Sequence, residues 1–166
     1  MFKHIVVTLD GSSYGERVLP YVADLADLGQ AHVTLLTVIA TDAPPPGAEG
    51  DEASSAPPRH SKAYEAYLDK HAEGLRGAGV QNVAVEVRAG SAARTIADAA
   101  RELGADLIAM STQGLGAETE QGLGGVASKV LMLAPCPVFM VRIQRPEPAR
   151  NPAEERWQAE GGANVG

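Results

Sequence analysis

Five short apolar runs recur along the chain, and most of the stretches between them carry apolar residues at helical spacing. The runs cover residues 4–10, 31–40, 82–90, 105–111 and 136–142. They are rich in β-branched residues, and only the third shows clear alternation of apolar and polar positions. Continuous apolar runs of this length are typical of strands that are buried on both faces of a parallel sheet.

The intervals between the runs predict helices. The first predicted helix covers residues 18–28. Ser12 or Ser13 before it can act as an N-cap, and Gly29 after it can end it. Pro20 is expected to bend this helix. Further helices are predicted at residues 61–76, 91–104 and 125–133.

This regular alternation of strands and helices indicates right-handed βαβ crossovers. It predicts a doubly wound α/β fold, an open parallel sheet with helices on both faces. Such sheets bind ligands beyond the carboxyl ends of the strands, where the strand order reverses. Residues that follow the first and fourth runs are therefore the candidates for a site.

Two segments fall outside the pattern. Residues 42–60 and 144–166 are rich in proline, alanine, glycine and acidic residues. They cannot bury enough apolar surface to offset the entropy of ordering them. We predict one domain over residues 1–143, with a mobile insert at about 42–60 and a flexible C-terminal tail at 144–166.

Composition narrows the class of protein. Apolar residues make up 45% of the chain, enough for a single core, and the formal net charge of −7 leaves no basic stripe for nucleic acid or an anionic membrane. No run has the length of a membrane span or the form of a secretory signal, so we expect a cytoplasmic protein. The single cysteine, Cys136, excludes an internal disulfide, and its apolar setting favours a buried inert thiol over a nucleophile.

An esterase-like motif follows the first run. Gly11 to Gly15 satisfy G-x-S-x-G on a strand-to-helix turn, which is the setting of a nucleophile elbow. A catalytic triad would need a later histidine, and only His32, His60 and His71 are available. His32 heads the second run, at the wrong end of the sheet, and the other two lie in or beside the insert. A turn with a helix cap is favoured over a catalytic serine.

Other nucleotide and metal motifs fit poorly. Residues 122–127 match the dinucleotide fingerprint G-x-G-x-x-A, but they begin eleven residues after Ser111 instead of directly after the strand. No glycine directly precedes a lysine, which excludes a P-loop, and four scattered histidines with one cysteine form no metal-ligand cluster.

A wider glycine pattern remains. It consists of Ser111, Gly114, nine residues, and then Gly124 and Gly125 at the start of a helix. Glycines let main-chain N–H groups approach an oxyanion, and a helix N-terminus adds partial positive charge, so the pattern suits a phosphate. Physics alone leaves an equal alternative, a glycine-rich loop that only turns the chain.

These residues resemble the universal stress protein family over residues 2–142. The family's adenine-nucleotide motif is G-x-x-G, nine residues, then G-[S/T]; here it reads Ser111-Thr112-Gln113-Gly114, nine residues, Gly124-Gly125. VTLDGS, LLTV and APCPVFMVR resemble further signatures of the family. The resemblance implies a five-stranded parallel sheet in the order 3-2-1-4-5, of the adenine nucleotide alpha hydrolase-like type. It also implies homodimers and bound ATP, or ADP or AMP in its place, with or without Mg²⁺.

Carried over by position, the resemblance places ten residues at the nucleotide. They are Thr8, Leu9, Asp10, Val38, Met110, Ser111, Gly114, Gly124, Gly125 and Val126. The first three would lie against the adenosine and Val38 against the base, while Gly114 and the last three would present N–H groups to the phosphates. Asp10 also fits a plain turn aspartate, and Val38 also fits core packing. No catalytic residue and no metal ligand is implied.

The expected homodimer pairs through the fifth strand, which comprises Pro137, Val138, Phe139, Met140 and Val141. In the order 3-2-1-4-5 this apolar run lies at a sheet edge. An uncovered apolar edge is an aggregation hazard that a second subunit would remove.

Two departures from the family motif bear on function. Ser111 replaces its first glycine, and Gly125 replaces the serine or threonine whose hydroxyl would bind phosphate. In addition, Glu118 and Glu120 put negative charge near the expected phosphates.

The leading hypothesis is a regulatory stress-response protein that binds an adenine nucleotide. It is not expected to be an enzyme beyond slow ATP hydrolysis, because no general base or metal ligand stands beside the phosphates. The main alternative is a nucleotide-free dimeric binding or scaffold module of the same fold. A third, an adenylating enzyme, would require an acceptor-substrate domain that the sequence does not show.

Overall fold

A computed structural model of the chain describes residues 1–27, 30–40, 61–113 and 123–142. Its centre is a five-stranded sheet in which every pairing is parallel and the strand order is β3-β2-β1-β4-β5, as predicted. The strands are β1 (His4–Thr8), β2 (His32–Ala40), β3 (Val83–Gly90), β4 (Leu107–Ser111) and β5 (Val138–Val141). The helices are the 3₁₀ turn η1 (Gly15–Val18), α1 (Leu19–Asp27), α2 (Ser61–Gly77), α3 (Ala92–Glu102) and α4 (Gly125–Leu133).

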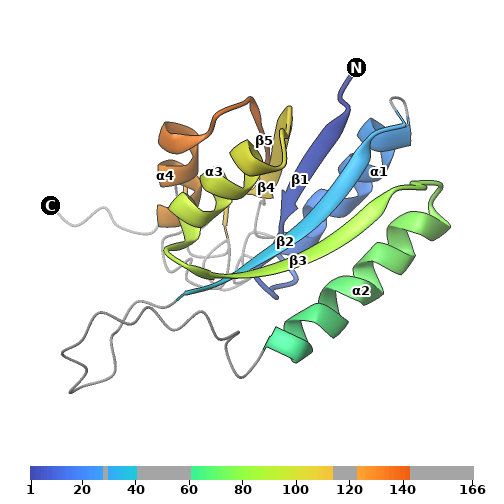
Figure 1. Ribbon diagram of the computed structural model, residues 1–166, viewed down its shortest axis with the longest axis horizontal. Coiled ribbons are helices and arrows are strands. Elements are labelled where there is room, and N and C mark those ends of the chain that lie inside the picture. Colours follow the sequence, from blue (N-terminus) through green and yellow to red (C-terminus); the bar gives the residue numbers. More distant parts are fainter. Residues whose placement is uncertain (28–29, 41–60, 114–122, 143–166) are drawn as a thin grey trace, which may run out of the picture.

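Helices cover both faces of the sheet, with α1 and α2 on one side and α3 and α4 on the other (Figure 1). Ile5 and Val7 of β1 pack on the first side with residues such as Leu68. Val6, between them, packs on the second side with residues such as Val130. Successive side chains of a strand point to opposite faces, so a strand covered on both faces needs an apolar residue at every position. This is why the first apolar run lacks alternation.

The first helix lies where it was predicted, but Pro20 stands near its start. The chain passes through the 3₁₀ turn η1 before the α-helix begins at Leu19, so Pro20 is the second residue of α1 instead of an interior one. In the first turn of an α-helix the missing N–H has no intrahelical partner to lose, and the fixed φ of proline suits the helix. Proline therefore stands at a helix start here, where it is well tolerated.

The predicted insert at 42–60, the tail at 144–166 and His60 lie outside the described residues. Within the described ranges, no helix is long and apolar enough to cross a membrane. Cys136 is half-buried, and desolvation raises the pKa of its thiol, which keeps it protonated and unreactive near neutral pH.

Candidate functional site

A cavity of about 490 Å³ opens at the carboxyl end of the sheet, between β1 and β4. This is the point where the strand order reverses, at which doubly wound sheets bind their ligands. Nine of the ten residues singled out from the sequence line this one cavity. They are Thr8, Leu9, Asp10, Val38, Met110, Ser111, Gly124, Gly125 and Val126. The tenth, Gly114, lies outside the described residues, as do Glu118 and Glu120.

One wall of the cavity is apolar. Leu36 and Val38 from β2, Met110 from β4 and Ile96 from α3 all contribute to it. All four pack in the same apolar cluster between the sheet and the helices α3 and α4. Val38 therefore both packs against the core and lines the cavity. A flat apolar ring is the kind of group that such a wall accepts.

The start of α3 completes this side of the cavity, and the sequence analysis did not anticipate it. Ser91, Ala92 and Ala93 line the cavity together with Ile96. Ser91 is the N-cap residue of α3, but its side chain makes no capping hydrogen bond. The available signal was positional: α3 follows β3, so its first residues must lie at the same edge of the sheet as the ends of β1 and β4.

Asp10 is held in a tight turn directly after β1. Its Oδ1 accepts hydrogen bonds from the N–H of Ser12 at 3.0 Å and from the Ser12 hydroxyl at 2.6 Å. The Ser12 Oγ in turn accepts the N–H of Gly15 at 3.0 Å. A Cβ at Gly15 would lie 2.7 Å from Asp10 Oδ1, so this position requires glycine. Asp10 is thus a turn residue that also lines the cavity.

The same turn explains the G-x-S-x-G motif. Tyr14 is the N-cap residue of η1, but its side chain makes no capping hydrogen bond. Instead the hydroxyl oxygen of the buried Ser12, two residues before Tyr14, accepts the N–H of Gly15, the first residue of η1. Ser13, the serine that a nucleophile elbow would use, is exposed. These contacts are those of a turn that caps a helix, the interpretation that the sequence favoured.

Glu16 ties this turn to α2. Its Oε1 accepts the Tyr67 hydroxyl at 3.1 Å and lies 3.3 Å from His71 Nε2. Desolvation, followed by the carboxylate of Glu16, raises the pKa of Tyr67 well above its usual range, so its hydroxyl stays a donor. His71 therefore contacts Glu16 and not the cavity. His32, at the start of β2, packs edge-on against the ring of His4.

The start of α4 forms the polar side of the cavity. Gly124 is the N-cap residue, and its N–H donates to the carbonyl of Thr112 at 2.8 Å. The first N–H groups of any α-helix have no intrahelical acceptor, so those of Gly125 and Val126 have no acceptor within α4. A Cβ at Gly125 would meet no atom of the described residues within 4 Å, and neither Gly124 nor Gly125 has a positive φ. Serine or threonine would therefore fit at position 125.

Ser111 ends β4 as a buried residue whose hydroxyl donates to the carbonyl of Gln113. The N–H of Thr112 donates to the carbonyl of Val141 at 3.0 Å, which continues the ladder between β4 and β5. The side chain that stands in place of the motif's first glycine thus stabilises the turn out of β4. Lys129 of α4 also lines the cavity, and the sequence analysis did not single it out.

The described ranges contain no group of three or more histidine, cysteine, aspartate or glutamate side chains that could hold a metal ion. The described cavity walls supply main-chain N–H groups, hydroxyls, the side chains of Asp10 and Lys129, and one apolar surface. Fold and cavity together define a doubly wound α/β protein with a ligand-sized site at its topological switch point.

The family follows from comparison with known proteins. The model of the Universal stress protein family matches residues 1–142, and the chain belongs to this family. One relative is Universal stress protein Sll1654 of Synechocystis sp. (strain ATCC 27184 / PCC 6803 / Kazusa), which is 35% identical over 145 residues, 85% of this chain and 86% of the relative.

Solved structures share the fold. A universal stress protein in complex with cAMP superposes with a TM-score of 0.63 at 20% identity, over 85% of this chain and 97% of the other. The universal stress protein from Archaeoglobus fulgidus in complex with dAMP also gives a TM-score of 0.63 at 20% identity, over 83% of this chain and 96% of the other. At this level of identity the likeness concerns the fold.

Proposed function

We propose that the chain binds ATP or a related adenine nucleotide in the cavity between β1 and β4 and acts as a regulatory protein of the stress response. The observation that carries the proposal is the convergence of Thr8, Asp10, Val38, Met110 and Gly124, far apart in the sequence, on one cavity. Its volume of about 490 Å³ lies within the range of small-molecule sites. Two proteins of the same fold are described as complexes with cAMP and dAMP, which supports an adenine nucleotide as the ligand class.

The walls suggest how such a ligand would lie. The base would rest on the apolar wall of Leu36, Val38, Ile96 and Met110, and the phosphates would face the N–H groups at the start of α4. Asp10, at the end of β1, would lie near the ribose. ATP is the proposed ligand, with Mg²⁺ carried by the nucleotide.

We propose a binding protein, not an enzyme. Among the described residues, the phosphate side of the cavity consists of main-chain N–H groups and the side chains of Ser111, Thr112 and Lys129, which include no carboxylate or imidazole to act as a general base. Any ATP hydrolysis would be slow, and conformation or partner choice would depend on which nucleotide is bound. We place the protein in the cytoplasm, where ATP is available.

We further propose a homodimer that pairs through β5. β5 forms one edge of the described sheet, and α4 beside it exposes Leu131, Met132 and Leu133, with Met132 86% exposed. A second copy would pair the open strand edge and cover apolar surface next to it.

The nucleotide proposal is tested by what the purified protein holds. Denaturation of protein purified without added nucleotide, followed by chromatography and mass spectrometry, should release an adenine nucleotide, and isothermal titration of the stripped protein should show ATP binding. A second candidate, a nucleotide-free module, is favoured by Gly125, which lacks the family's phosphate-binding hydroxyl. Absence of both a bound nucleotide and ATP binding would establish that candidate.

A further inference from the structure

One acidic and one basic side chain stand on the described part of the cavity wall: Asp10 and Lys129. Asp10 lies at the end of β1, where its carboxylate is bonded to Ser12 within the turn. Lys129 lies on α4, the helix whose first residues form the polar side of the cavity. Charge is therefore distributed unequally over the cavity, with the positive group on α4.

The position of Lys129 on α4 directs it toward the start of the helix. Lys129 follows Gly125 by four residues, so both lie on the same face, about one turn apart. The Cα–Cβ bond of a helical residue tilts toward the N-terminus, and long side chains lie over the preceding turn. The ammonium group can therefore reach an anion bound to the N–H groups of Gly125 and Val126.

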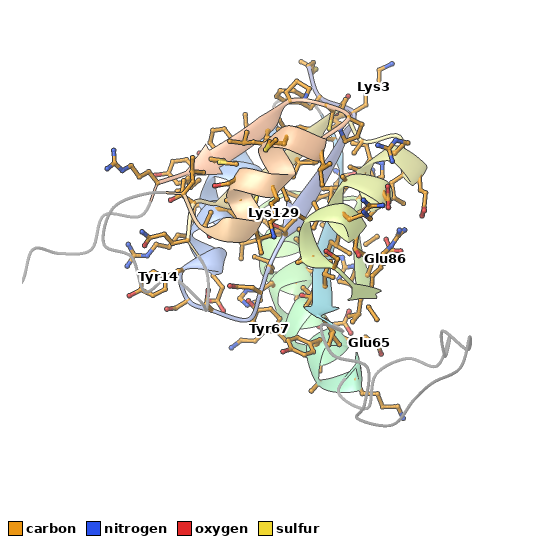
Figure 2. All side chains as sticks on the ribbon, turned by 90° about the vertical axis from the view of Figure 1, so that its left-hand side faces the viewer. Lys3, Tyr14, Glu65, Tyr67, Glu86 and Lys129 are labelled. Atoms are coloured by element: carbon orange, nitrogen blue, oxygen red, sulfur yellow. The ribbon has the colours of Figure 1, made fainter. Side chains whose placement is uncertain are left out.

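The opposite wall also favours negative charge at this place. Figure 2 shows Lys129 on the side of α4 that faces α3. The first residues of α3, from Ala92, line the same cavity, so the partial positive charges of two helix N-termini converge there. In the described part of the chain Lys129 has no ion pair, and it is exposed, so its ammonium group can move to a ligand.

From this arrangement we infer that Lys129 binds the phosphate groups and makes the site selective for phosphorylated nucleotides over the nucleoside. The inference rests on the proposed function and adds the specificity of the site. Lys129 supplies positive charge at the polar end of the cavity, and hydrogen bonds from the N–H groups of α4 orient the phosphate groups. Its contribution grows with the charge of the ligand, so ATP and ADP gain more from Lys129 than AMP does, and adenosine gains nothing. The attraction crosses solvent-exposed space and falls with ionic strength.

The test compares four proteins: wild type, Lys129→Met, Lys129→Arg and, as a matched control, Lys70→Met. Methionine keeps the apolar stem of lysine and removes only the charge. Lys70 is an exposed residue of α2 outside the cavity wall, so its replacement changes the net charge by the same amount. Isothermal titration with ATP and competition with adenosine are measured at low and high salt.

We expect Lys129→Met to weaken ATP binding about ten-fold at low salt and to leave adenosine binding unchanged. Lys129→Arg and Lys70→Met should bind ATP with the affinity of the wild type. The difference in ATP affinity between the wild type and Lys129→Met should become smaller at high salt. Equal effects of Lys129→Met on ATP and adenosine, or no effect on either, would overturn the inference while nucleotide binding stood. A wild-type protein that binds neither ligand would overturn the proposed function itself, and the role of Lys129 with it.

Discussion

The N–H of Gly124 donates to the carbonyl of Thr112 across 2.8 Å, and this bond joins the start of α4 to the end of β4. The contact distinguishes two neighbouring glycines. A Cβ at Gly124 would lie 3.2 Å from that carbonyl oxygen, whereas a Cβ at Gly125 would meet none of the described residues within 4 Å. Gly124 is therefore needed for the close approach of the two segments, and Gly125 is free to vary.

Gly125→Ser should tighten ATP binding. The hydroxyl would stand at the first residue of α4, where it can donate to a phosphate oxygen, and a charge-assisted hydrogen bond contributes about 1.5–3 kcal/mol, or roughly ten-fold or more in affinity. Isothermal titration with ATP, with and without Mg²⁺, measures the change.

Gly124→Ala is the matched control, because its Cβ presses on Thr112 instead of facing open space. It should lower thermal stability without improving affinity. A folded Gly125→Ser variant that binds ATP no better than the wild type would mean that the phosphates lie elsewhere.

Ser12→Ala should destabilise the fold by about 1–3 kcal/mol, the usual cost of leaving a buried hydrogen-bonding group unsatisfied. The change removes the donor to Asp10 and the acceptor of the Gly15 N–H together. Urea denaturation measures the free energy of unfolding. Ser13→Ala, at the exposed neighbouring position, should change it by less than about 0.5 kcal/mol. Equal stability of the two variants would show that the bonds of Ser12 contribute little.

Stability should fall as the pH drops below 6.5, the ordinary pKa of histidine, in part because of His4. His4 Nδ1 lies 3.0 Å from the carbonyl oxygen of Leu103, which can only accept, and Nε2 lies 2.9 Å from the Thr34 hydroxyl. The neutral ring thus donates through Nδ1 and accepts through Nε2. Desolvation, and then the neighbouring His32, lower the pKa of His4 in the folded state.

The direction of the pH effect follows from proton binding. The unfolded chain binds a proton at His4 more readily than the folded one, so stability rises with pH between the lowered pKa and 6.5 and is fully present above 6.5. Urea denaturation from pH 5 to pH 8 should show this slope, and it should be smaller in His4→Gln. An identical slope in both proteins would assign the effect to other groups.

Met140→Pro should convert the proposed dimer into a folded monomer. The carbonyls of Pro137 and Val141 accept hydrogen bonds from β4, so the alternation of the strand turns the N–H of Val138 and Met140 to the outer edge. Proline at an edge position removes one outward donor and leaves the bonds to β4 intact.

Light scattering at micromolar concentration should give the mass of two chains for the wild type and of one chain for Met140→Pro. Met140→Ala is the control, because it loses the same side-chain packing but keeps the N–H, and it should remain a dimer. A wild-type monomer would refute pairing through β5, and a dimeric, folded Met140→Pro variant would place the interface elsewhere.

The sequence by itself determined the class of fold and most of the candidate site. The run from Ile5 to Val7 is apolar at every position, which is typical of a strand covered on both faces, and the regular alternation of such runs with helical segments indicated the doubly wound arrangement. The spacing of Ser111, Gly124 and Gly125 was likewise visible in the chain, because a helix start that follows a strand at a fixed distance is a local feature.

Only the tertiary structure decided which other residues join them. Lys129 and Ile96 come to the cavity because α3 and α4 pack side by side on one face of the sheet, and no periodicity within either helix indicates that contact. Local sequence also did not predict the 3₁₀ turn η1, which follows the Ser12 that bonds to Asp10 and contains the Glu16 that bonds to Tyr67 of α2. The periodicity of apolar residues predicts the secondary structure of a segment and its buried face, whereas the contact between two segments depends on the packing of the whole core.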